Sequence, residues 1–143
     1  MMIWKNLKYF TENEKWGDAG RMNPALLLLL DKLREKTGKP FTIHCGYEEG
    51  GHASGSRHYR GDAADFHIDG MSFPEAVDCL LRALHETEFL GQVSAAYVGL
   101  GIYPDWNTPG FHLDIRGYSA RWGRIGGEYV SFEKAYKHAG EGK

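Results

Sequence analysis

Two histidines and one aspartate form the group of residues in this chain best suited to chemistry. His58 and Asp65 lie seven positions apart, and His112 follows much later in the sequence. Two imidazoles and one carboxylate can fill three corners of a tetrahedral zinc site and leave the fourth for water, as in catalytic rather than structural zinc sites. By pattern alone, a metal site and an ordinary surface or packing pair both stay open, because this spacing is less regular than HExxH.

Composition sets the limits of this hypothesis. The chain has 143 residues, the size of one ordinary domain, so we expect a single domain over residues 1–143. Lysine and arginine number 17 against 19 acidic residues, and a net charge of -2 argues against nucleic acid as a partner. The longest apolar run, Ala25 to Leu30, is far shorter than the roughly 20 residues that cross a bilayer, so we expect no membrane insertion.

The start of the chain bears on where the protein acts. Met1 to Lys8 contains basic residues but no following apolar region, and so does not resemble a secretory signal. We therefore expect cytoplasmic synthesis. Both cysteines are interpreted as free buried thiols, with a disulfide as the alternative, because the cytoplasm is reducing.

Helix and strand signals predict an α+β fold. A helix is expected from Ala25 to Lys36, because Asn23 caps it, Pro24 occupies its first position and Gly38 follows its end. The other expected elements are strands over 41–45, 62–68, 93–102 and 111–115, a glycine-rich loop over 46–61, a helix over 73–88 opened by a capping box, and a short terminal helix capped by Ser131. This order predicts helices packed against a mostly antiparallel sheet.

The strand over 62–68 can present its acidic residue to a cleft. Side chains alternate between the two faces of a strand, so Asp65 points away from Phe66, which enters the core. Gly61 lets the chain fold back so that His58 meets Asp65. His112, on a separate strand, would complete the site.

Two motifs resemble those of a known family. Ser-x-His-x-x-Gly-x-Ala-x-Asp resembles the first metal motif of the zinc D-alanyl-D-alanine carboxypeptidases and related murein endopeptidases, which share the hedgehog/DD-peptidase fold. It is matched at Ser56, His58, Gly61, Ala63 and Asp65. The later part resembles a short branch of the family with Gly-x-Tyr, Phe-x-His-x-Asp, an arginine and a tryptophan. These fall at Gly101, Tyr103, Phe111, His112, Asp114, Arg116 and Trp122.

The resemblance covers about Phe41 to Arg124. It implies that His58, Asp65 and His112 bind Zn²⁺ and that the substrate is a peptide of bacterial peptidoglycan. The expected protein is a zinc metallopeptidase that is encoded by a phage or prophage and acts at the cell wall. The alternatives are a non-catalytic zinc-stabilised binding or structural domain, such as a phage particle component, and a cytoplasmic peptidase acting on free muropeptides.

One departure from the family pattern concerns the general base. Many members carry an acidic residue three positions before the last histidine, where this chain has Pro109. Asp114 is the nearest acidic substitute and shares a strand face with His112. It is predicted either to accept a proton from zinc-bound water or to hold the ligand imidazole. Asp105 is a weaker candidate for the base.

A second departure concerns charge recognition. Relatives commonly read Ser-Gly-Tyr-Arg and use the arginine to stabilise charge on the substrate, whereas this chain has Glu48 after Gly46-Tyr47. A carboxylate there would repel a substrate that ends in a carboxylate, so we expect an endopeptidase that cleaves stem or cross-bridge peptides. The residues expected to contact substrate are Ser56, Arg57, Tyr103 and Arg116. Arg57, Arg60 or Arg116 can replace the missing cation, or each can be a solvated surface charge.

Other conspicuous residues have milder interpretations. His44, His52 and His67 are interpreted as structural or surface histidines rather than as a fourth ligand, which would close the open zinc position. Trp122 is interpreted as a core residue, with a place in a substrate groove as the alternative.

Overall fold

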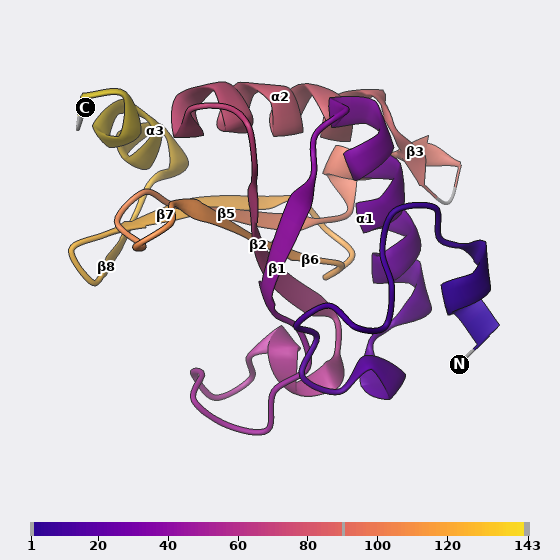
Figure 1. Cartoon of the computed structure of the whole chain (residues 1–143). Helices are drawn as coiled ribbons and strands as arrows, with labels where there is room; N and C mark the ends of the chain where they lie inside the picture. Colours follow the sequence, from indigo (N-terminus) through magenta and orange to yellow (C-terminus); the bar gives the residue numbers. More distant parts are fainter. Residues whose placement is uncertain (1, 90, 142–143) are drawn as a thin grey trace.

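The helices lie against one face of a sheet, as Figure 1 shows. The computed structural model describes residues 2–89 and 91–141, and within these residues three α-helices accompany a six-stranded sheet. The predicted α+β fold with a mostly antiparallel sheet is confirmed. No helix of the described residues has both the length and the apolar character needed to cross a bilayer.

The first two helices begin where the sequence predicts. Helix α1 (Pro24–Thr37) opens at Asn23, whose side chain accepts a hydrogen bond from the backbone N–H of Ala25. Helix α2 (Phe73–Glu86) opens with the predicted capping box at Ser72 and ends two residues before the expected position. The capping side chains satisfy backbone N–H groups that lack partners within the helix, so they fix where each helix begins.

The third helix and the strands complete the framework. Helix α3 (Phe132–Glu141) opens at Ser131, whose hydroxyl accepts from the backbone N–H of Lys134. The strands of the large sheet lie in the spatial order β1 (Phe41–Cys45), β2 (Ala63–Ile68), β6 (Gly110–Asp114), β5 (Gly99–Tyr103), β7 (Ala120–Ile125) and β8 (Glu128–Val130). Strands β5 and β7 pair in parallel, and the other neighbours are antiparallel.

The predicted strand over 93–102 is confirmed over residues 99–102 and wrong over residues 94–98. The chain forms β4 (Gln92–Val93), paired with β3 (Glu88–Phe89), then a short 3₁₀ helix over Ser94–Ala96, and only then β5. The bend occurs because buried Ser94 donates its hydroxyl to the carbonyl of Leu84 at 2.6 Å. This contact between distant residues outweighs the local preference for extended chain.

The predicted loop over 46–61 contains one short helix that matters for the site. A 3₁₀ helix over Arg57–Arg60 is capped by the Ser56 hydroxyl, which accepts from the N–H of His58 at 3.2 Å. It ends at Gly61, whose φ of 74° lies in the left-handed region that favours glycine. A Cβ at this glycine would also collide with the backbone carbonyl of Arg21. The turn therefore needs glycine for two independent reasons.

The core lies between the helices and the inner face of the sheet. Leucines of α1 and α2 pack there with aromatic side chains from the strands. Phe41 and Phe66 stack with ring centroids 5.0 Å apart, and Phe111 lies 5.5 Å from Phe66. Gly123 allows α3 to pack closely against the sheet, because a Cβ at this position would collide with the Cβ of Ala135. With the helices on the inner face, the outer face of the sheet is available for a site.

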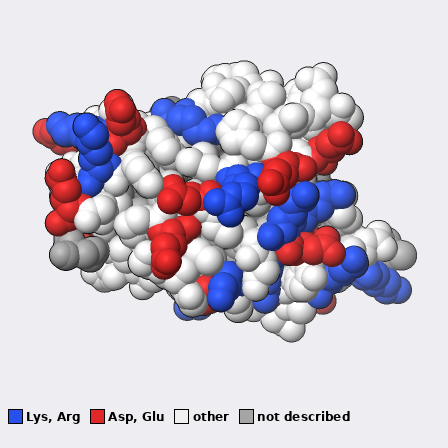
Figure 2. Space-filling view, turned by 90° about the horizontal axis from the view of Figure 1, so that it is seen from above, with Lys and Arg blue, Asp and Glu red and all other residues white. Residues whose placement is uncertain are grey.

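Charge on the surface is mixed. Acidic and basic side chains are interspersed over the face shown in Figure 2. This distribution agrees with the net charge of -2.

Candidate metal centre

A row of residues on four paired strands crosses the outer face of the sheet. In register, Asp65 of β2 pairs with His112 of β6, His112 pairs with Gly101 of β5, and Gly101 pairs with Trp122 of β7. Gly101 leaves room for the indole, because a Cβ there would contact the ring of Trp122. Side chains on this face are therefore arranged around one shared space, while Phe66 enters the core as predicted.

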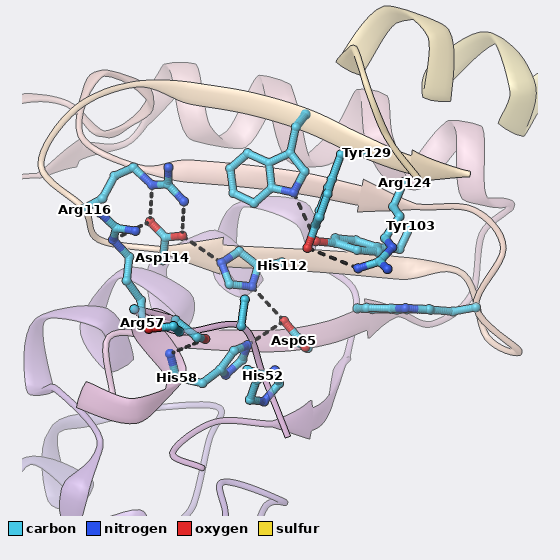
Figure 3. A pocket seen from close by; sticks show the side chains of 16 residues that line it. His52, Arg57, His58, Asp65, Tyr103, His112, Asp114, Arg116, Arg124 and Tyr129 are labelled. Atoms are coloured by element: carbon cyan, nitrogen blue, oxygen red, sulfur yellow. Dashed lines mark hydrogen bonds and ion pairs between the residues drawn. The ribbon is translucent and has the colours of Figure 1, made fainter. Parts of the chain in front are cut away.

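The three predicted ligands converge beside this row. His58 Nε2 lies 3.2 Å from Asp65 Oδ1, and His112 Nδ1 lies 3.0 Å from the same oxygen (Figure 3). Each residue offers one ligand atom, and these atoms all lie within 4.8 Å of one another. The three side chains are 3%, 14% and 13% exposed, so the cluster is shielded from bulk water. Such a group can hold a metal ion.

Hydrogen bonds on the far side of each imidazole fix which nitrogen faces the cluster. His58 Nδ1 donates to the carbonyl oxygen of Gly46 at 2.8 Å, because a carbonyl can only accept. His112 Nε2 donates to Asp114 Oδ2 at 2.7 Å. In the neutral rings the remaining nitrogens carry lone pairs aimed at the Asp65 carboxylate. Three electron-rich atoms facing one another require a cation between them, either a proton or a metal ion.

The electrostatics of the cluster agree with this requirement. Burial acts to raise the pKa of Asp65, but its close contacts with the His112 and His58 imidazoles hold it well below its usual range. Burial lowers the pKa of His112, yet its hydrogen bonds to Asp114 and Asp65 raise the pKa to about 9. A proton on His112 thus meets part of the demand for positive charge, and a divalent ion would meet it more fully.

Asp114 is held in a way that suits orientation of His112. It is 0% exposed, and Arg116 donates to both of its oxygens at 2.8 Å. Arg57 Nε lies 3.9 Å from Oδ1. Burial acts to raise the pKa of Asp114, but the hydrogen bonds from Arg116 and His112 place it well below its usual range. Of the two predicted roles, this arrangement favours the orienter, because a strongly acidic, fully engaged carboxylate is a weak proton acceptor.

A second group of possible ligands overlaps the first. Cys45, His52 and His58 also bring ligand atoms within 4.8 Å of one another. The rings of His52 and His58 stack at 4.3 Å, and the Cys45 thiol donates to Asp65 Oδ2 at 3.4 Å. Burial and then the Asp65 charge raise the pKa of the thiol, which disfavours the thiolate form that binds metals. The set His58, Asp65 and His112 therefore fits a divalent ion better.

A cavity of about 680 Å³ opens beside the cluster. This volume is typical of sites that bind small ligands, including short peptides. Two of the weaker candidates, Arg60 and Asp105, do not line it. The other residues predicted for the site do, namely Ser56, Arg57, His58, Asp65, Tyr103, His112, Asp114 and Arg116. The two sequence motifs therefore contribute side chains to one cavity.

Some interpretations of neighbouring residues need correction. Trp122 lines the cavity with its ring 5.4 Å from that of His112, so the groove alternative replaces core packing. His52 also lines the cavity, whereas His44 and His67 hydrogen-bond to each other at 2.6 Å. Both cysteines are free, and they are partly rather than fully buried.

The acidic residues outside the cluster lie in other settings. Glu48 Oε1 lies 3.9 Å from His52 Nε2, and its side chain is 37% exposed. Asp105 accepts from the N–H of Gly126 at 2.8 Å and pairs with His138 at 3.0 Å, which leaves it poorly suited to act as the base.

The polar cavity residues Arg124 and Tyr129 were not predicted from the sequence. Arg124 and Tyr129 lie on β7 and β8, neither of which was predicted. The available signal was Gly126-Gly127 between two short runs that can form strands, a pattern typical of a β-hairpin.

No protein-family model matches the chain, and no curated protein gives a significant match. The link to zinc peptidases therefore rests on the motifs and on a cluster compatible with such a site.

Proposed function

We propose that this protein is a zinc-dependent peptidase that cleaves stem or cross-bridge peptides of peptidoglycan. The observation that carries the proposal is the convergence of His58 Nε2, Asp65 Oδ1 and His112 Nδ1 beside a cavity large enough for a short peptide. The opposite nitrogens of both rings are engaged by Gly46 and Asp114. Such support is typical of metal-binding histidines, because it fixes both tautomer and ring orientation.

The residues of the chain have distinct parts in the proposed reaction. His58, Asp65 and His112 would hold the ion, and a bound zinc ion supplies a Lewis acid that polarises a peptide carbonyl and acidifies water. Asp114, kept anionic by Arg116, orients His112.

The lining on either side of His112 would position the substrate. Ser56 and Arg57 lie at the 3₁₀ helix that also carries His58, and Tyr103 lies on β5. Binding on both sides of the cluster would hold a peptide bond beside the ion, as hydrolysis requires.

Metal removal tests this function directly. Purified protein is incubated with peptidoglycan, and newly released amino groups are measured before chelation, after chelation and after zinc is restored. We expect activity to disappear with the metal and to return with zinc. Hydrolysis that persists after complete metal removal would refute the mechanism.

A non-catalytic zinc-stabilised domain is the second candidate. It is favoured by the engagement of Asp114 with Arg116 and by Pro109 at the position where relatives carry the base. In that case zinc would raise the thermal midpoint of unfolding, yet the zinc-loaded protein would release no amino groups from peptidoglycan. An enzyme would show both effects.

A further inference from the structure

The two walls of the cavity differ in how their arginines are engaged. Figure 3 shows Arg116 and Asp114 on one side of His112, with Arg124 on the other side. Arg116 donates twice to a carboxylate, so its charge is already matched. Arg124 instead donates to the Tyr129 hydroxyl at 3.1 Å and to the Gly127 carbonyl at 3.0 Å, both neutral oxygens. Among the described residues no carboxylate pairs with Arg124, so its positive charge is available to a ligand.

Arg124 is also held in place at the cavity. It lies on β7 two residues beyond Trp122, on the same strand face, and pairs in register with Tyr129 of β8. The guanidinium carbon lies 4.6 Å from the centre of the Tyr129 ring, a cation–π contact that restrains the long side chain. Less conformational freedom is therefore lost when Arg124 binds an anion.

A second donor belongs to the same wall. Tyr103 Oη accepts a hydrogen bond from Trp122 Nε1 at 3.0 Å, so its own proton stays available to another acceptor. Burial raises the pKa of Tyr103 to about 12, which keeps this proton in place at neutral pH. The Tyr103 ring stacks on Trp106 at 4.4 Å, which fixes its position and gives the wall an apolar surface.

We propose that Arg124 and the Tyr103 hydroxyl form a subsite for a carboxylate of the peptide substrate, on the side of the cluster opposite Asp114. A guanidinium and a phenol offer donors to a carboxylate, and the aromatic rings contact the adjoining chain. Glu48 does not line the cavity, so the repulsion expected from it does not oppose a carboxylate here. The inference rests on the proposed function for its ligand class, a peptide.

The subsite is tested by binding, which does not depend on turnover. The full chain is titrated with two pairs of probes while its tryptophan fluorescence is followed. Each pair consists of a carboxylic acid and the corresponding carboxamide. One pair is built on N-acetyl-D-alanyl-D-alanine, with a terminal carboxylate, and the other on L-alanyl-γ-D-glutamyl amide, with an internal one. Each titration is made with zinc and after chelation, because chelation separates recognition by Arg124 from direct ligation of zinc.

We expect the wild type to bind at least one acid about 10-fold to 100-fold more tightly than its amide, with and without zinc. Arg124→Gln should abolish this preference, Arg124→Lys should keep part of it, and Tyr103→Phe should reduce it by about twofold to tenfold. Arg82→Gln is the matched control, because Arg82 is exposed on α2 and the charge change is the same. Circular dichroism verifies that each variant is folded.

The outcomes separate the subsite from the proposed function. Acid preference lost in Arg124→Gln but kept in Arg82→Gln supports the subsite, even if no probe is cleaved. The pair that shows the preference identifies the carboxylate as terminal or internal. A wild type without acid preference in either pair, or an equal preference in Arg124→Gln, overturns the proposal even if peptidoglycan is hydrolysed.

Discussion

Substitution of Asp114 by asparagine isolates the role of this carboxylate. Asp114 accepts from His112 Nε2 at 2.7 Å and from Arg116 at 2.8 Å, and it is fully shielded from solvent. Asp114→Asn keeps the size of the side chain and one acceptor oxygen but removes the charge. We expect weaker zinc binding, because the negative charge makes His112 a better electron donor and the hydrogen bond fixes its ring.

The size of the effect follows from these contacts. Hydrogen bonds to an ionised partner are about twice as strong as neutral ones. Asp114→Asn should therefore weaken the hydrogen bond from His112 Nε2 by about 1.5–2 kcal/mol. At about 1.4 kcal/mol per factor of ten, the Kd for zinc should rise about 10-fold to 30-fold. Arg116 also loses its buried counter-charge, and the free energy of unfolding should fall by about 1–3 kcal/mol.

The assay combines zinc affinity with peptidoglycan hydrolysis. Zinc affinity is measured by competition with a chelating dye, and released amino groups are followed as free zinc is increased. We expect Asp114→Asn to need more zinc but to recover activity once loaded. Asp78→Asn is the matched control, because Asp78 is exposed on α2 and its substitution removes the same negative charge. Wild-type zinc affinity combined with no hydrolysis at saturating zinc would show that Asp114 is the base and refute the orienting role.

Three further predictions address the surroundings of the site. Burial and the Asp65 charge raise the pKa of the Cys45 thiol, so less thiolate forms at pH 8. Iodoacetamide should therefore modify Cys45 in the metal-free folded protein far more slowly than in the denatured chain. Equal modification rates in the two states, measured by mass spectrometry, would contradict this. Gly61→Ala should lower the free energy of unfolding by at least about 2 kcal/mol in urea, because of its positive φ and the contact with the Arg21 carbonyl. Ser72→Ala should lower it by about 1 kcal/mol through loss of the cap, and an unchanged urea midpoint would show that the cap is dispensable.

Local signals predicted two helices and the strands that carry Asp65 and His112, but not the 3₁₀ helix that carries His58. Asn23 and Ser72 begin helices because their side chains satisfy free backbone groups nearby in sequence. Strand alternation likewise placed Asp65 on the face opposite Phe66. These features depend on residues within a few positions of one another, which is why the sequence revealed them.

Features that depend on distant contacts could not be predicted in this way. The break at Ser94 arises from a hydrogen bond to Leu84, and a propensity for extended chain carries no sign of it. Trp122 was assigned to the core because its size suggests burial, whereas Gly101 on the neighbouring strand leaves it space beside the cavity. Arg124 was missed because β7 and β8 were not recognised.

A crystal structure of the zinc-loaded protein, with anomalous scattering recorded at the zinc edge, tests the central claim most directly. The account predicts one strong peak bound by His58 Nε2, a carboxylate oxygen of Asp65 and His112 Nδ1, with an open position facing the cavity. A peak bound by Cys45 and His52 without His112, or no peak among these residues, would contradict it.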